Sequence, residues 1–266
     1  MNVKFCIEIN YAKFKKKTGN KLLHRFDYGK IVNRNHVKGD DMNSEVKTIT
    51  YAALFHDIGK MGHRAGRETG DHSSLGAEIL KRTLRDSSSK SDIVDAARYH
   101  HASELRTAGL HEQHIAYIVY EADNISAASD RRSEDQEGGT GSSKFELYRP
   151  LESVFNVLQT EKMNTFEMMH RLRGLEESAE GWMAYPVKKD SSVRATRDQY
   201  DYLLGRIEEN LKAIDLDQSH PNSVLKLLEA TLSYVPSSTK TDEIADISLY
   251  DHTKMTAAIA ACLYQY

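Results

Sequence analysis

Apolar positions along the chain recur mostly at steps of three and four residues, the spacing that places side chains on one face of a helix. The first strong run, residues 45–61, predicts one helix that carries His56 and Asp57 near its C-terminal end. Further runs predict helices at 73–84, 111–128, 200–214, 224–232 and 247–264, and one more helix whose far end is at 99–101. Strand patterns are nearly absent, so the chain is predicted to be all-α.

Two stretches depart from this pattern. Residues 1–41 contain a lysine cluster without a sustained apolar period, and we expect an atypical, disordered extension with Met42 as a possible natural start. Residues 133–143 are rich in Glu, Asp, Gly and Ser, a composition typical of a mobile loop. We therefore predict one domain over 42–266, with a variable, partly disordered insertion at about 133–195 and a possible helix near 166–172.

Composition restricts the location of the protein more than its function. The chain has 266 residues with 36 Lys and Arg against 39 Asp and Glu, a balance that neither favours nor excludes a nucleic-acid partner. The two cysteines lie far apart and fit no zinc spacing or disulfide framework. No apolar run is long enough to cross a bilayer and no signal peptide is visible, so we expect a cytoplasmic protein without a membrane partner.

Histidine and aspartate residues recur at the ends and flanks of the predicted helices, where they can face a common bundle interior. They are His56, Asp57, His72, His100, His101 and Asp123. This mixture of ring nitrogens and carboxylate oxygens suits one or two divalent cations, with Asp57 as a shared ligand. Lys60, one turn after His56, could neutralise a phosphate oxygen or simply be a solvated lysine. By itself, the pair at 56–57 is also compatible with a capping aspartate beside a packed histidine.

The segment 53–60, Ala-Leu-Phe-His-Asp-Ile-Gly-Lys, is similar to the signature of the HD phosphohydrolase superfamily. More narrowly, it resembles the N-terminal nuclease domain of the large subunit of type III-A CRISPR effectors, the Csm complex. Further segments agree with that family, at 72–80, 99–101, 116–125, 130–132 and 234–252. The resemblance runs from about Thr48 to the end of the chain and is weak over 133–220.

The resemblance implies a circularly permuted HD-superfamily helical bundle, in which the helix with the first histidine of ordinary HD proteins comes last. His252 fits that role, although it could otherwise belong to a capping pair with Asp251. By the same resemblance, one metal would be held by His56, Asp57, Asp123 and His252. A second metal would be completed or supported by His72, His100 and His101. The metal identity, Mn, Ni, Co or Mg, stays open.

The implied function is a metal-dependent nuclease specific for single-stranded DNA, with His56, Asp57 and Lys60 as catalytic residues. Its implied partners are the CRISPR guide RNA and other Csm subunits of an antiviral defence complex, with target RNA as the activator. The chain would end before the palm domains that make cyclic oligoadenylates. Two alternatives stay open: an HD-type nucleotide phosphohydrolase, and a non-catalytic assembly domain.

Overall fold

The structure is a computed structural model that describes residues 41–67, 69–130, 144–158, 167–175 and 185–266. The expected N-terminal extension therefore lies outside the described residues, except for its last residue, which begins the first helix. The expected mobile loop at 133–143 also lies outside them.

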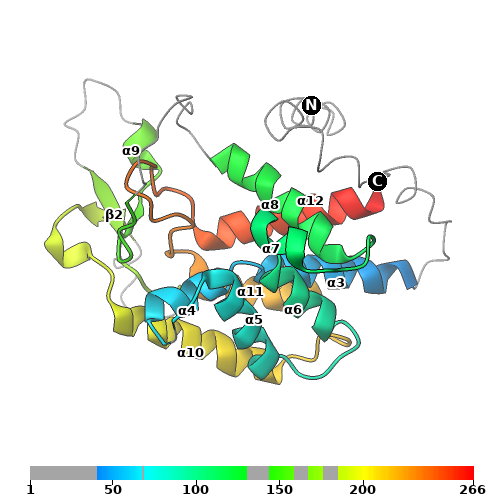
Figure 1. Cartoon of the computed structure of the whole chain (residues 1–266). Helices are drawn as coiled ribbons and strands as arrows, with labels where there is room; N and C mark the ends of the chain where they lie inside the picture. The colour runs from blue at the N-terminus through cyan, green and yellow to red at the C-terminus, as the bar shows by residue number, and fades with distance from the viewer. Residues whose placement is uncertain (1–40, 68, 131–143, 159–166, 176–184) are drawn as a thin grey trace.

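The described residues form a helical bundle with a small sheet at one end (Figure 1). The bundle helices are α3 (Asp41–Phe55), α4 (Gly59–Ala65), α5 (His72–Thr83), α6 (Lys90–Arg98), α7 (Ala102–Thr107), α8 (Ile115–Asp130), α10 (Arg197–Ala213), α11 (Pro221–Leu232) and α12 (Leu249–Gln265). The prediction of a helical bundle is confirmed. The short α7 was not predicted, since six residues are too few to show a helical period.

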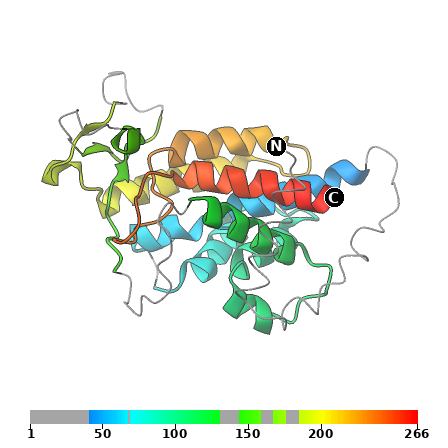
Figure 2. The ribbon, with the colours of Figure 1, turned by 90° about the horizontal axis from the view of Figure 1, so that it is seen from above.

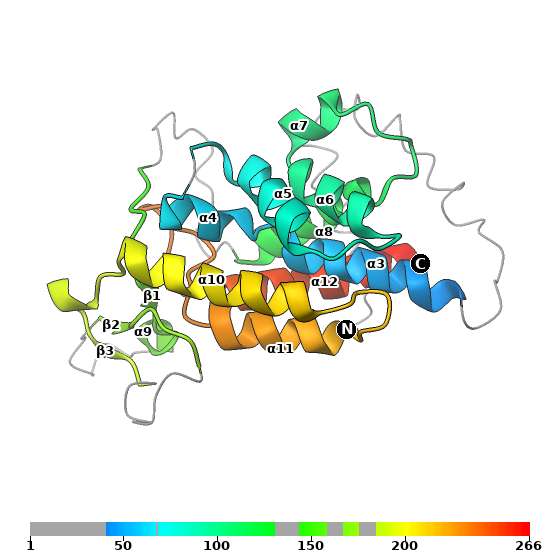
Figure 3. The same cartoon turned by 90° about the horizontal axis from the view of Figure 1, so that it is seen from below.

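The last helix packs against the first described helix. α12 packs against both α3 and α8, and Figure 2 shows it running beside them. Its buried face includes His252 together with Leu249 and Ala260, and the latter two join the same apolar core as Ile49 and Phe55 of α3. On the other side of α3, α10 and α11 lie next to each other (Figure 3). The two ends of the described chain are thus brought together, as the permuted order implied.

The predicted single helix at 45–61 is wrong, because it is two helices with a turn between them. α3 ends at Phe55 and α4 begins at Gly59, and the turn is closed by bonds from the amides of Ile58 and Lys60 to the carbonyls three residues earlier, both 3.0 Å. Gly59 allows α5 to approach closely at this point, since a Cβ atom at this position would lie 1.7 Å from the carbonyl oxygen of His72. His56 and Asp57 consequently lie in the turn, not inside a helix.

A small sheet, which was not predicted, lies within the expected insertion of the otherwise helical chain. It has three short antiparallel strands in the order β1 (Leu151–Glu152), β2 (Met168–His170) and β3 (Val187–Lys188). Leu151 pairs with His170, and Met168 pairs with Lys188. The helix expected near 166–172 is therefore wrong, because β2 is the central strand and is bonded on both sides. The short helix α9 (Phe155–Leu158) follows β1.

None of the helices within the described ranges is both long enough and apolar enough to cross a membrane.

Candidate metal centre

His56 is completely buried at the turn after α3 and is oriented by the end of that helix. Its Nδ1 atom lies 2.7 Å from the carbonyl oxygen of Ala53. The last carbonyls of a helix lack an intrahelical partner, so this oxygen is free to accept a hydrogen bond from the ring. Nδ1 then donates, and Nε2 faces Asp57 Oδ2 and Asp123 Oδ1, each 3.4 Å away.

His100 repeats this arrangement after α6. It is buried, and its Nδ1 atom lies 2.8 Å from the carbonyl oxygen of Ala97, again three residues earlier at a helix end. Its Nε2 atom lies 3.7 Å from Asp57 Oδ1. Two helices that end in the same way thus aim two Nε2 atoms at one carboxylate.

The buried carboxylate of Asp57 faces two groups of histidines, one with each oxygen. Oδ2 lies 3.4 Å from Nε2 of both His56 and His252. Oδ1 lies 3.6 Å from His72 Nε2 and 3.7 Å from His100 Nε2. The arrangement is that of a carboxylate able to bridge two cations.

Asp123 of α8 and His252 of α12 complete the first group. Asp123 Oδ1 lies 3.1 Å from His252 Nε2. The other ring nitrogen of His252 lies 3.3 Å from the hydroxyl oxygen of Ser126, which in turn donates to the carbonyl oxygen of His252 at 3.4 Å. Ser248 caps α12, because its hydroxyl oxygen accepts a hydrogen bond from the amide of Asp251. This cap places His252 in the first turn of the helix.

The second group consists of His72, His100 and His101. His72 begins α5 behind its capping residue Asp71, and its Nε2 atom lies 2.8 Å from that of His101. The rings of His100 and His101 have centroids 4.0 Å apart. One potential ligand atom from each of these three histidines lies within 4.8 Å of the other two. The same holds for one potential ligand atom from each of His56, Asp57 and His252.

Burial and charge act in opposite directions on these groups. Burial lowers the pKa of His56, but the carboxylates of Asp57 and Asp123 outweigh it and raise the value to about 9. Burial would raise the pKa of Asp57, yet Lys60 and His56 hold it well below its usual range. For His72 and His100 burial dominates, lowering the pKa of His72 to about 4 and holding that of His100 well below its ordinary value.

The donor set fits divalent cations. The Nε2 atoms of His56 and His100 are buried without a hydrogen-bond partner, an expensive state for a polar atom unless it ligates something. His252 Nε2 and Asp123 Oδ1 are at hydrogen-bond distance, 3.1 Å, but the other nitrogen–oxygen separations, 3.4–3.7 Å, are long for hydrogen bonds. They are close to the spacing of about 3–3.5 Å that ligand atoms adopt around one cation at bond lengths of roughly 2.1 Å. The structure thus brings together all seven predicted ligands.

The side chain of Lys60 is mostly buried and its ammonium group has two protein partners, so Lys60 is not the simply solvated lysine of the alternative interpretation. Its ammonium lies 2.6 Å from Asp57 Oδ2 and donates to the carbonyl oxygen of Ser237 at 3.1 Å. One turn later, buried Arg64 donates to the carbonyl oxygen of Pro236 at 2.7 Å. Both cations of α4 therefore hold the segment 236–248, which we call the strap and which joins α11 to α12 (Figure 1).

The strap and residues 145–147 form one wall of a cleft of about 680 Å³ beside the histidines. This wall was not predicted, because its residues are neither ligands nor part of a periodic pattern. Ser126 was also missed, although its position three residues after Asp123 on α8 places both on one helix face. That spacing is the signal that could have identified it.

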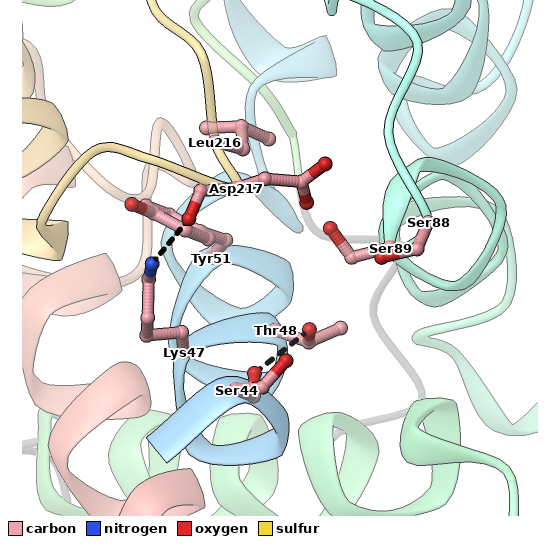
Figure 4. Close-up of a pocket in the computed structure, with 8 residues that line it drawn as sticks. All are labelled: Ser44, Lys47, Thr48, Tyr51, Ser88, Ser89, Leu216 and Asp217. Carbon is pink, nitrogen blue, oxygen red and sulfur yellow. Dashed lines mark hydrogen bonds between the residues drawn. The ribbon is translucent and has the colours of Figure 1, made fainter. Parts of the chain in front are cut away.

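A second cavity, of about 380 Å³, lies toward the other end of α3 (Figure 4). It is lined mainly by hydroxyl groups, and Lys47 there donates to the backbone oxygen of Asp217 at 2.9 Å. None of the seven predicted ligands lines it.

Comparison with known proteins places the chain near one group of proteins. The HD domain family matches residues 27–128. The chain is 35% identical over 231 residues to "CRISPR system single-strand-specific deoxyribonuclease Cas10/Csm1 (subtype III-A)" of Enterococcus italicus, covering 85% of this chain and 29% of that protein. The protein of the same description from Mycobacterium tuberculosis is 33% identical over 247 residues, with the same coverage.

Solved structures give the same result. Csm1 of T. onnurineus superposes with a TM-score of 0.58 at 30% identity, over 81% of this chain and 28% of that one. A Csm1–Csm4 subcomplex of the type III-A CRISPR-Csm interference complex gives 0.57 at 27% identity, over 81% of this chain and 27% of the matched chain.

The fold and the histidine–aspartate site thus define an HD-domain protein. More narrowly, over 85% of its length the chain is similar to Cas10/Csm1 proteins of type III-A CRISPR systems, as its sequence implied. It spans about 29% of the length of the Enterococcus italicus and Mycobacterium tuberculosis relatives.

Proposed function

We propose that the chain is a metal-dependent nuclease domain that hydrolyses phosphodiester bonds of single-stranded DNA. The observation that carries the proposal is the position of Asp57, whose two oxygens face two separate groups of histidines. The names of the relatives, which describe single-strand-specific deoxyribonucleases, support the choice of substrate.

Bound divalent cations would supply Lewis acidity and lower the pKa of water, which is the chemistry that phosphodiester hydrolysis requires. His56, Asp57, Asp123 and His252 would hold one cation, and His72, His100 and His101 would help to hold a second with the other oxygen of Asp57. The carbonyl oxygens of Ala53 and Ala97 accept hydrogen bonds from the Nδ1–H groups of His56 and His100. These hydrogen bonds fix both rings in the orientation that metal binding would require.

Lys60 has a separate role in this proposal. Its ammonium is positioned at the mouth of the site by Asp57 and by the carbonyl oxygen of Ser237. Once cations compensate the charge of Asp57, the ammonium can neutralise an oxygen of the scissile phosphate.

The test is cleavage of an end-labelled single strand with Mn²⁺, comparing the wild type with Asp57→Ala. We expect a loss of at least about 100-fold, since the variant removes the ligand common to both groups. Addition of EDTA should abolish cleavage by the wild type. His111→Ala is the matched control, because His111 is exposed and belongs to neither histidine group. Equal cleavage by the wild type and Asp57→Ala would refute the proposal.

A nucleotide phosphohydrolase is the second candidate, favoured by the size of the cleft, which is within the range for small ligands. Turnover of a deoxynucleoside triphosphate and of an oligonucleotide, measured at equal concentrations, separates the two activities. An assembly domain without catalysis would fold, bind its partners and turn over neither substrate.

We also propose a cytoplasmic setting in a Csm complex, with a guide RNA, other Csm subunits and target RNA as the activator. The solved Csm1–Csm4 subcomplex supports a Csm4-like partner. The test is reconstitution with Csm subunits and guide RNA, followed by addition of complementary RNA. A faster cleavage of single-stranded DNA is expected, and an unchanged rate would contradict activation by target RNA.

A further inference from the structure

The cleft beside the metal centre has two chemically different walls. One wall carries the ligands, including Asp57, Asp123 and His252, together with Lys60. The other wall, formed by the strap and residues 145–147, contributes the apolar side chains Phe145, Leu147, Ile244 and Ile247. They lie among the polar strap residues Ser237, Ser238, Thr239, Lys240, Asp242 and Glu243. A strand whose phosphodiester lies at the ligand wall would therefore have apolar side chains of the same cleft available to its neighbouring sugar and base.

Two apolar side chains of this wall are unusually open to solvent. Phe145 has 64% of its surface exposed, and Ile244 has 50% exposed. An exposed aromatic ring in a cleft next to potential metal ligands indicates a binding surface more strongly than a single exposed apolar residue elsewhere. The reason is that a bound molecule would bury the surface of the ring, which contributes to affinity.

The backbone of Phe145 is fixed to the strap. Phe145 forms an antiparallel bridge with Lys240, flanked by bonds of 2.9 Å from the amide of Glu146 to the carbonyl of Thr239 and from the amide of Thr241 to the carbonyl of Lys144. The strap itself is held at its middle by Arg149, which donates to the carbonyl oxygen of Glu243 at 2.8 Å and also to that of Lys240. The ring is thus presented by an anchored backbone.

We infer that Phe145, supported by Ile244, is a stacking platform for one unpaired nucleobase adjacent to the scissile phosphate. The inference rests on the proposed nuclease function and gives a physical reason for single-strand specificity. In a duplex, each base is already paired and stacked, so its face is unavailable to a protein ring. In a single strand the face is free, and an aromatic ring can stack on any of the four bases.

The test uses the complete chain in EDTA, where no cleavage occurs, and measures binding of a fluorescein-labelled oligothymidine by anisotropy. Phe145→Ala should weaken binding about tenfold, in the range expected for loss of one base–aromatic stack. Phe145→Trp should restore the affinity, because a larger ring preserves stacking. Phe155→Ala is the matched control: Phe155 is 61% exposed but does not line the cleft, so its loss should leave binding unchanged.

A second strand, equal in length but built of abasic residues, distinguishes stacking from an indirect structural effect. The wild type should bind it as weakly as Phe145→Ala binds oligothymidine, and Phe145→Ala should cause no further loss on the abasic strand. An equal loss on both strands, or no loss on either, would overturn the inference.

The two proposals fail in different ways. If the wild type shows no Mn²⁺-dependent cleavage but Phe145→Ala selectively weakens binding of the base-bearing strand, the nuclease assignment fails and the stacking platform stands. If the wild type cleaves and Phe145→Ala binds both strands like the wild type, the reverse holds.

Discussion

His56 is the residue at which proton binding and metal binding compete. Without metal, burial lowers its pKa, but Asp57 and Asp123 raise it to about 9, so the ring is an imidazolium near neutral pH. Because this folded-state value exceeds that of an unfolded histidine, its contribution to stability is complete below about pH 6.5 and is lost as the pH rises through about 9. A cation needs the same Nε2 atom and must displace the proton.

Manganese binding should therefore release close to one proton at pH 7, and the affinity should increase from pH 6 toward pH 9. Isothermal titration calorimetry in two buffers of different ionisation enthalpy measures the number of protons released. His56→Ala should reduce that number, whereas His111→Ala should not. An observed binding heat that is independent of the buffer would contradict this assignment.

Glu121 of α8 provides a second prediction at the scale of one residue. Burial raises the pKa of its carboxyl group to about 7, so its ionisation opposes folding, and stability falls as the pH rises from about 4.5 through 7. Glu121→Gln should raise the free energy of unfolding by about 1–2 kcal/mol at pH 8 and by much less at pH 5. Urea denaturation at both pH values measures the difference, and an equal effect at both would exclude ionisation as its cause.

At the scale of elements, the crossing of α4 and α5 fixes His72 relative to Asp57. Gly59 meets the first turns of α5, where an added Cβ atom would lie 1.7 Å from the carbonyl oxygen of His72 and 2.5 Å from the amide nitrogen of Gly76. Both neighbours are backbone atoms, so neither can move aside without displacing the helix that carries His72.

Gly59→Ala should consequently lower the free energy of unfolding by about 3 kcal/mol or more. Gly205→Ala is the matched control, since its Cβ atom would lie 3.6 Å from the end of the flexible Arg67 side chain, an ordinary contact. In the interior of α10 this change should stabilise the protein by about 0.5–1 kcal/mol. Thermal unfolding of both variants gives the signs, and a stable Gly59→Ala would show that the helices are not in close contact.

The strap shows how one element depends on several others. Lys60 and Arg64 hold its beginning, and Arg149 holds its middle, through backbone carbonyls that carry no sequence information. The conformation of the strap is therefore set by charged side chains elsewhere in the chain. That conformation in turn determines which strap side chains line the cleft.

At the scale of the whole molecule, the metal centre joins parts of the chain that are far apart in sequence. Its ligands come from the α3–α4 turn, from α5, from the residues after α6, and from α8 and α12. A cation bound to them would favour the folded state, because the unfolded chain does not assemble the set.

Manganese at about 100 times its dissociation constant should stabilise the wild type by about 2.7 kcal/mol, or roughly 5–10 °C in Tm for a domain of this size. Asp57→Ala should show little shift, and EDTA should reverse the shift of the wild type. His111→Ala should respond like the wild type. An equal rise in Tm for Asp57→Ala would mean that manganese binds elsewhere.

The helices, most of the ligand candidates and the family follow from the sequence without a structure. Periodic apolar positions specify amphipathic helices locally, and the motif at 53–60 together with the further matching segments indicates the HD family. His252 required the resemblance, because its residue type and position on a helix carry no sign of a partner at residue 57.

Features that depend on distant neighbours emerged only from the packed molecule. The break between α3 and α4 follows from the approach of α5 to Gly59, and β2 forms because strands on both sides pair with it. The division of Asp57 between two histidine groups and the place of Phe145 in the cleft beside them also arise from packing. Local sequence sets which side chains are available, and long-range contacts set the distances at which their chemistry becomes possible.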